Sequence, residues 1–371
     1  MHQVERAIFD LRRGLPIVVH DESDGADRGV LVYPIESLTE DRLTDVLDLA
    51  GSAPTLTLTR HRMAAMGFPM HTDSASLPLR RAEGLSAEAL YCAAAAAEDP
   101  RTRLFEQPRP ASASERAALA LMRRALLVPA ALTATIDGSR QAAVERAIAD
   151  GSILRVSARS AEQCFDSGAG MLKRVSEADV PLSESVQSRF VLFREPDGLR
   201  EHLAVLIGES GVWPEAVPTR LHSACLTGDL FGSLRCDCGE QLQNAVRTIA
   251  QMGGGVLLYL AQEGRGIGLA NKLRAYALQD EGLDTIDADR MLGFGEDSRR
   301  YRVAVDMLTA LSIRSVKLLT NNPSKVDALR EGGIEVAARD GLYGRLTRQN
   351  RRYLKAKASR SGHLLDDFLD E

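Results

Sequence analysis

The chain has 371 residues, a length that suggests two or three domains. Hydrophobic residues make up 44% and charged residues 26%, and the net charge of −5 excludes a globally basic nucleic-acid-binding protein. No apolar run approaches the roughly 20 residues that span a bilayer, and the N-terminus lacks the pattern of a signal peptide, so we expect a cytoplasmic protein without membrane segments. Five cysteines, an odd number, argue against a disulfide framework.

The first half is predicted to alternate helices with strands. Apolar residues at helical spacing predict helices over 4–13 and 38–49, and β-branched runs predict strands over 17–19, 30–33 and 55–59. Two further helical pieces are predicted within 83–127, on either side of a break at 107–110. Ser112, followed three residues later by Glu115, predicts a capping box at the start of the second piece.

After a predicted junction at 166–190, the alternation resumes. Strands are predicted over 203–207, 220–222, 256–260 and 316–319, and helices over 241–252, 269–278, 300–311 and 323–330. The fold class is therefore predicted to be α/β with α+β character, in two domains that each pack helices on a mixed sheet.

Three of the five cysteines fall within 14 residues, as Cys225-(x10)-Cys236-x-Cys238. Three thiolates form a soft ligand set that suits Zn²⁺. The spacing leaves open a structural site closed by His222 and a catalytic site in which water takes the fourth position. Small buried cysteines without a metal are the third alternative.

Three loops also carry reactive or charged residues. The glycine-rich run 262–268 follows a predicted strand and precedes a helix, so its amides and Arg265 could receive an anion, although a tight turn is also possible. Lys325 lies just after another strand end and could neutralise a phosphate, but a lysine in a first helical turn is more often solvated. Asp297 and Arg299 are either a weak surface ion pair or an acid/base group with an electrostatic partner.

Together these motifs resemble GTP cyclohydrolase II, the first committed enzyme of riboflavin synthesis. The resemblance covers about residues 172–366 and is carried by strings in family order at 220–229, 233–239, 262–268, 271–280 and 319–323. It implies a GTP cyclohydrolase II domain at 172–371. That domain would hydrolyse GTP to formate, pyrophosphate and 2,5-diamino-6-(5-phospho-ribosylamino)pyrimidin-4(3H)-one.

The resemblance also implies roles for individual residues. One catalytic zinc per subunit maps onto the three cysteines. Asp297 falls at the proton acceptor and Tyr276 at a tyrosine of the hydrolytic chemistry. Arg299 falls at the nucleophile for the α-phosphate, although a guanidinium that stays protonated is equally suited to stabilising charge. The implied GTP site comprises Arg220, Leu221, His222, Ser223, Ala224, Gln241, Glu263, Gly264, Arg265, Thr285, Thr320 and Lys325.

Mg²⁺ is expected with the triphosphate, and the protein is expected to form a homodimer with GTP as its small-molecule partner. Ala224 departs from the family, in which many members have a glutamate just before the first cysteine. This departure removes a polar contact near the zinc.

The N-terminal half, residues 1–171, resembles 3,4-dihydroxy-2-butanone-4-phosphate synthase at 7–14, 17–19 and 33–36. The acidic loop of that family, which supplies metal ligands, reads here Ser-Asp-Gly-Ala-Asp-Arg-Gly at 23–29, and no Gly-His-Thr-Glu string is present. We therefore predict a catalytically silent domain that holds a dimer together or braces the other domain. The acidic residues Asp21, Glu22, Asp24 and Asp27 could still bind a cation, but a solvated turn is favoured.

Three alternatives to the main function remain open. The chain could be bifunctional, with a working N-terminal domain. It could stop at the formamidopyrimidine triphosphate, or it could be a nucleotide-binding module without turnover.

Overall fold

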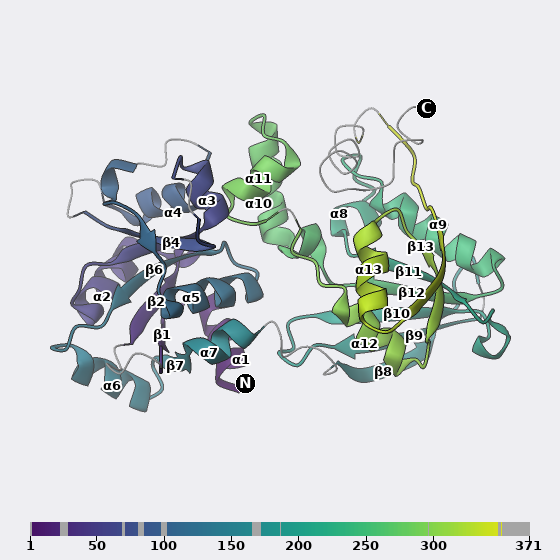
Figure 1. The fold of residues 1–371 in the computed structure, drawn as a ribbon, viewed down its shortest axis with the longest axis horizontal. Helices are drawn as coiled ribbons and strands as arrows, with labels where there is room; N and C mark the ends of the chain where they lie inside the picture. Colours follow the sequence, from purple (N-terminus) through teal and green to yellow (C-terminus); the bar gives the residue numbers. More distant parts are fainter. Residues whose placement is uncertain are drawn as a thin grey trace. The chain divides into compact units, whose positions relative to one another are not determined.

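The computed structural model describes residues 2–22, 29–68, 71–80, 85–97, 102–164, 172–185, 187–295, 297–347 and 350. The chain forms two compact units, each built around its own sheet (Figure 1). The first unit combines Met1–Ser167 with Ala270–Asp297, and the second combines Gly168–Leu269 with Ser298–Glu371. Asp24 and Asp27 of the predicted acidic loop lie outside the described residues.

The first unit contains a seven-stranded mixed sheet in the order β5-β4-β3-β6-β2-β1-β7. Its strands are β1 (Ile17–His20), β2 (Val30–Pro34), β3 (Thr55–Thr59), β4 (Ser74–Pro78), β5 (Arg109–Pro110), β6 (Ala130–Thr135) and β7 (Leu154–Ser157). Only the β1–β7 pairing in this sheet is parallel. The helices are α1 (His2–Arg12), α2 (Glu40–Ala50), α3 (Arg60–Ala65), α4 (Ala87–Ala95), α5 (Ala113–Arg124), α6 (Gln141–Ala149), α7 (Ala158–Glu162), α10 (Leu269–Asp280) and α11 (Thr285–Met291).

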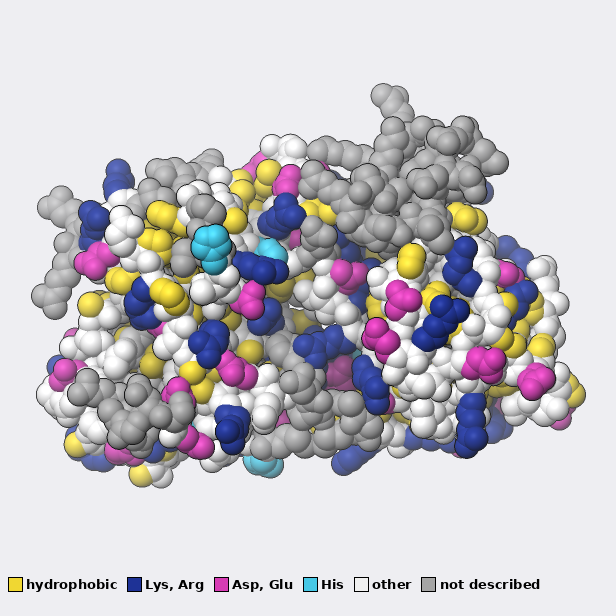
Figure 2. Space-filling view, in the orientation of Figure 1, with side chains coloured by type: hydrophobic (Ala, Val, Ile, Leu, Met, Phe, Trp, Pro, Cys, Tyr) yellow, Lys and Arg dark blue, Asp and Glu magenta, His cyan; other side chains and the backbone are white. Residues whose placement is uncertain are grey.

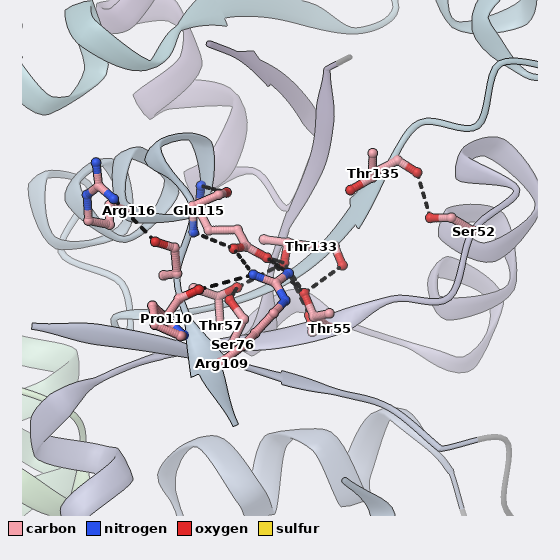
Figure 3. Close-up of polar contacts among 12 residues, drawn as sticks. Ser52, Thr55, Thr57, Ser76, Arg109, Pro110, Glu115, Arg116, Thr133 and Thr135 are labelled. Atoms are coloured by element: carbon pink, nitrogen blue, oxygen red, sulfur yellow. Dashed lines mark hydrogen bonds and ion pairs between the residues drawn. The ribbon is translucent and has the colours of Figure 1, made fainter. Parts of the chain in front are cut away.

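A buried polar cluster lies in the first unit where α5 begins (Figure 3). The predicted capping box is confirmed, because Ser112 N donates to Glu115 Oε2 at 2.7 Å and Glu115 N donates to Ser112 Oγ. The same carboxylate accepts two bonds from Arg109, at 2.8 and 2.7 Å, and one from Thr55 Oγ1 at 3.1 Å. A charged group this deeply buried is stable only with such a full set of partners.

The second unit contains a seven-stranded sheet in the order β14-β13-β11-β12-β10-β9-β8. Its strands are β8 (Lys173–Asp179), β9 (Ser188–Arg194), β10 (Glu201–Ile207), β11 (Val217–Ser223), β12 (Gly255–Leu260), β13 (Ser315–Leu319) and β14 (Glu335–Asp340). The four strands from β14 to β12 run parallel, and β10, β9 and β8 continue the sheet antiparallel. This confirms the predicted mixed α/β architecture.

Helices cover both faces of this second sheet. The helices are α8 (Leu226–Asp229), α9 (Cys238–Gln251), α12 (Arg302–Ala310) and α13 (Pro323–Glu331). Apolar residues of α12 and α13 share one buried cluster with the sheet, and Ala245 and Ile249 of α9 share another with Ile207 and Leu257. The central strands are therefore buried from both sides, as parallel strands generally are.

The predicted junction at 166–190 is wrong in part, because β8 forms within it. All seven residues of β8 are exposed, so the strand has no apolar alternation that a sequence pattern could reveal. Its register with β9 comes from backbone pairing at the sheet edge instead.

Acidic and basic side chains are interspersed over the face seen in Figure 2, as the nearly balanced composition suggests. None of the helices in the described part of the chain combines the length and the hydropathy that a membrane span requires.

Candidate active site and metal centre

Most of the predicted site residues lie on β11 or in the segments that follow β11, β12 and β13. Strand β11 is flanked by β12 on one side and β13 on the other. Successive parallel strands are therefore added first on one side of β11 and then on the other. In open α/β sheets, ligands bind outside the carboxyl ends of strands at such a switch point. The loops that leave β11, β12 and β13 carry the cysteine cluster, the glycine-rich run and Thr320, respectively.

The three predicted metal ligands come together. The sulfur atoms of Cys225, Cys236 and Cys238 all lie within 4.8 Å of one another, and those of Cys225 and Cys236 are 3.6 Å apart. Tetrahedral coordination with Zn–S bonds of about 2.3 Å requires sulfurs about 3.8 Å apart. The donor set and its spacing therefore fit zinc.

The neighbouring backbone leaves room for this cluster. A Cβ atom at Gly228 would lie 2.8 Å from Cys236 Sγ and 3.1 Å from Cys225 Sγ, and one at Gly239 would lie 2.3 Å from Gly228 O. Both positions therefore require glycine. Hydrogen bonding with Cys225 is the main factor that raises the pKa of Cys236 to about 11, so the protein alone does not favour three thiolates. A bound cation reverses that preference.

His222 does not join the cysteines, which decides against the Cys3His alternative for the described residues. Its Nε2 lies 3.2 Å from Asp229 Oδ1, and its ring stacks on Tyr259 with centroids 5.6 Å apart. Asp229 Oδ2 also accepts hydrogen bonds from Tyr259 Oη at 2.8 Å and Cys225 N at 2.9 Å. Asp229 thus fixes both the imidazole and the backbone of Cys225, as a carboxylate beside a metal ligand commonly does.

Burial lowers the pKa of His222 below its usual 6.5, despite the opposing effect of Asp229. The imidazole is therefore neutral at pH 7. Because the carboxylate can only accept, Nε2 carries the proton and Nδ1 is an acceptor.

Arg220 is buried beside this network and ties β11 to its neighbours. It donates to Leu319 O at 2.8 Å and to Gln241 Oε1 at 2.7 Å, and Gln241 donates in turn to Asp237. Burial lowers the pKa of Arg220 to about 10, which still leaves the guanidinium charged at neutral pH.

Several buried polar atoms near the end of β11 lack a hydrogen-bond partner within the described residues. Arg220 Nε, His222 Nδ1 and Ser223 Oγ are all buried and have no hydrogen-bond partner within the described residues. Buried polar groups in proteins are nearly always paired, so three such atoms within four residues indicate a ligand-binding surface.

Lys325 is not solvated, which excludes the alternative considered for a lysine in a first helical turn. Only 6% of it is exposed, and its Nζ donates to Leu221 O at 2.7 Å. Nζ also lies 5.6 Å from the ring centre of Tyr301, as does the guanidinium carbon of Arg299. The aromatic ring therefore brings two cations close together.

The glycine-rich run forms a left-handed loop after β12. Gly264 and Arg265 have φ values of 60° and 62°, and a Cβ at Gly266 would lie 2.8 Å from Ser298 O. Arg265 O accepts from Ser298 N at 3.1 Å. The loop is thus more than a tight turn, because it packs against the segment that leads into Arg299.

Two side chains at the start of this loop make specific contacts. Glu263 Oε2 accepts from Leu226 N at 2.6 Å, which links the loop to the residue after Cys225. Gln262 pairs through its amide with both backbone groups of Arg300. These contacts place the loop, the cysteine cluster and the Arg299 segment in one connected arrangement.

Thr320 and Ala224 are two further predicted GTP contacts in the second unit. Thr320 is 1% exposed and its Oγ1 accepts from Asn322 N at 3.0 Å, while Ala224 N donates to Leu260 O at 2.8 Å. Ala224 therefore continues the backbone pairing of β11 with β12 for one more residue.

Three predicted residues fall in the first unit instead. Tyr276 lies on α10 with Lys272 Nζ 5.6 Å from its ring centre, and Thr285 begins α11. Asp297 is exposed at the last position of the segment that belongs to the first unit.

Sequence reasoning did not single out five residues that shape the site. These are Gly228, Asp229, Tyr259, Gln262 and Tyr301. Gly228 and Asp229 lie between the cysteines of the cluster, so their position was a usable signal. Tyr259 and Tyr301 carried none, because a tyrosine in a strand or before a helix is ordinarily a core residue.

Comparison with known proteins points to one enzyme family. The family model described as GTP cyclohydrolase II matches residues 173–340. The GTP cyclohydrolase-2 proteins of Xylella fastidiosa (strain Temecula1) and Azospirillum brasilense are each 41% identical to this chain. They align over 98% of it and over 87% and 94% of their own lengths. The Pasteurella multocida protein of that name is 47% identical over 194 residues, 52% of this chain and 88% of its own.

Among solved structures, a two-domain 3,4-dihydroxy-2-butanone 4-phosphate synthase from A. baumannii is similar to this chain. The match covers 92% of this chain and 99% of the chain in that structure. The identity is 18% and the TM-score 0.37. The sequence relatives, two of which extend over nearly the whole chain, establish the family. The chain belongs to the GTP cyclohydrolase II family and is an enzyme.

Proposed function

We propose that this enzyme hydrolyses GTP to formate, pyrophosphate and 2,5-diamino-6-(5-phospho-ribosylamino)pyrimidin-4(3H)-one, the first step of riboflavin biosynthesis. The observation that supports it best is the position of the three-cysteine cluster directly after the unpartnered polar atoms of β11. A metal centre and a polar binding surface meet there at the switch point of the sheet.

Cys225, Cys236 and Cys238 would hold one zinc ion per subunit. The zinc would supply a Lewis acid that makes water nucleophilic near neutral pH, which hydrolysis at the purine C8 requires. Asp229 supports this centre by holding the Cys225 backbone N–H. His222, which is hydrogen-bonded to Asp229, is a fixed, neutral imidazole.

The purine and the triphosphate need different partners, and β11 and its neighbours offer both. His222 Nδ1 and Ser223 Oγ can accept hydrogen bonds from the N–H groups of guanine. Arg220, Lys325 and Arg299 supply positive charge for phosphate oxygens, in a buried setting where charge interacts strongly. Mg²⁺ would accompany the triphosphate.

Hydrolysis at C8 and loss of pyrophosphate are separate steps with separate residues. We assign the phosphate step to Arg299, with Asp297 as proton acceptor, and assign Tyr276 to the hydrolytic step. Leu221, Ala224, Gln241, Glu263, Gly264, Arg265, Thr285 and Thr320 complete the proposed GTP site. Arg299 stabilises charge on the α-phosphate, whether or not it also attacks it.

Mass spectrometry of the products tests this function directly. Zinc-loaded protein incubated with GTP and Mg²⁺ should give formate, pyrophosphate and the ring-opened ribosyl monophosphate. A ring-opened product that keeps its triphosphate would contradict the phosphate step. Unchanged GTP would contradict turnover altogether, and Ala224→Glu would then be the first variant to test for restored activity.

The N-terminal half is proposed to be silent in the butanone phosphate reaction. Incubation with ribulose 5-phosphate and Mg²⁺ should therefore give no 3,4-dihydroxy-2-butanone 4-phosphate, and its formation would establish a bifunctional enzyme. A homodimer in the cytoplasm completes the proposal, and light scattering of the purified protein measures the oligomeric state.

A further inference from the structure

The first unit holds the segment Ala270–Asp297 through a buried arginine. Arg62 lies on α3 and is 1% exposed. Its Nε donates to Ala93 O at 2.9 Å, and its Nη2 donates to Cys92 O and Ala96 O at 3.1 and 2.9 Å. Its Nη1 donates to Met291 O at 3.0 Å, at the end of α11.

The partners of Arg62 show what this side chain does. Apart from a contact with the sulfur of Met291, its acceptors within the described residues are carbonyl oxygens. Burying a cation without a carboxylate is costly, and burial lowers the pKa of Arg62 to about 10. The guanidinium therefore serves as a multivalent hydrogen-bond donor that joins α3, α4 and α11.

A second contact lies two residues beyond Met291. Thr59 Oγ1, at the start of α3, donates to Gly293 O at 2.6 Å. Gly293 has a φ of +84°, and a Cβ there would lie 3.1 Å from Thr59 Oγ1 and 3.2 Å from Pro129 Cγ. Glycine is thus required at the close approach that this hydrogen bond creates.

The other end of the segment is held as well. Asn271, which is fully buried, donates to Leu126 O at 3.0 Å. Arg274 pairs with Glu36 at 3.0 Å, and Glu36 also accepts from Val128 N. Residues of the N-terminal half therefore contact both α10 and the end of α11.

We propose that the N-terminal half is a positioning domain for the GTP reaction, in which Arg62 and Thr59 fix the segment that carries Tyr276, Thr285 and Asp297. This inference rests on the proposed function for the roles of those three residues. The Pasteurella multocida relative is matched over 88% of its length by 194 residues, so it is too short to contain both halves. Contacts of the kind made by Arg62 and Thr59 require a chain that contains both halves, as this one does.

Hydrogen-exchange mass spectrometry of the full-length, zinc-loaded protein tests the positioning role. Arg62→Met keeps the apolar stem but removes the donors, and Thr59→Val removes the hydroxyl at constant shape. We expect amides within 285–295 to exchange about tenfold faster in each variant, because each loses at least one buried hydrogen bond. Thr59→Ser, which keeps the hydroxyl, should restore the wild-type rate.

Glu115→Gln is the matched control, because it weakens a buried ionic cluster of the same unit that makes no hydrogen bond to this segment within the described residues. It should lower the melting temperature without a selective change at 285–295. Arg62→Met and Thr59→Val should also lower kcat more than they raise KM for GTP, as expected for catalytic groups that are misplaced.

Two results would overturn the inference. One is unchanged exchange at 285–295 in both variants, and the other is an increase no larger than in Glu115→Gln. Thr59→Val provides the answer if Arg62→Met does not fold. The exchange measurement needs no turnover, so a failure of the proposed GTP reaction would appear separately, as wild-type protein that makes no product.

Discussion

The side-chain amide of Gln262 hydrogen-bonds both backbone groups of Arg300. Its Nε2 donates to Arg300 O at 2.6 Å, and its Oε1 accepts from Arg300 N at 3.1 Å. Gln262 is 6% exposed and lies in the short connection between the end of β12 at Leu260 and the loop that begins at Glu263. A rigid, buried side chain thereby fixes the backbone next to Arg299.

We expect Gln262→Leu to impair the phosphate step selectively. Loss of two buried hydrogen bonds frees the segment around Arg299, and pyrophosphate release should fall roughly tenfold to a hundredfold. Zinc content and formate release should change little, so a ring-opened triphosphate should accumulate, as it should in Arg299→Ala. Simultaneous quantification of formate and pyrophosphate measures this ratio.

Gln243→Leu, an exposed position on α9, is the control for a glutamine-to-leucine change in the same unit. Equal losses of formate and pyrophosphate in Gln262→Leu would show that the residue stabilises the fold generally and does not position Arg299.

Cys236→Ser should remove the metal and abolish formate release. A serine hydroxyl is a much weaker zinc ligand than a thiolate, and the two remaining cysteines do not make a complete site. Elemental analysis should find less than one zinc per chain, and the ring-opened product should be absent. Full activity in this variant would contradict the catalytic metal assignment.

Gly228→Ala should weaken zinc binding although it alters no ligand. The added Cβ would lie 2.8 Å from Cys236 Sγ, closer than a carbon–sulfur contact permits, so the cluster must shift. A chelator competition assay should show zinc loss at lower chelator concentration, by about tenfold or more. Gly211→Ala, where a Cβ meets nothing within 4 Å, should behave like the wild type.

The elements of the central sheet were predictable because their apolar runs are strong local signals. Strand β12 and helix α13 begin and end within one residue of the predicted bounds. The exposed strand β8 was not predictable, since its position depends on backbone pairing with β9 rather than on its own side chains.

The site was predictable to the extent that its chemistry lies in short strings. The cysteine spacing identified three residues whose sulfur atoms come together in the structure. By contrast, the burial of Lys325 depends on Leu221, more than a hundred residues earlier, and no local pattern shows that contact. The same holds for Arg62. Its sequence context resembles that of a surface residue on a short helix, and only the fold brings its acceptors on α4 and α11 close to it.

The Glu115 cluster should make the stability of the first unit depend on acid pH. Burial alone would raise the pKa of this carboxyl, but hydrogen bonds from Arg109 and Ser112 outweigh it and hold the pKa below 4.5. Between the folded and unfolded pKa values the unfolded chain binds the extra proton, so the free energy of unfolding falls as the pH drops below about 4.5. Above that pH the contribution is fully present.

Thermal unfolding followed from pH 7 to pH 3 checks this dependence. Glu115→Gln should have a lower melting temperature at pH 7 and a shallower decline toward pH 3, because the variant has no carboxylate to protonate. The two curves should therefore converge at low pH. Parallel curves across the whole range would contradict the assignment of acid sensitivity to Glu115.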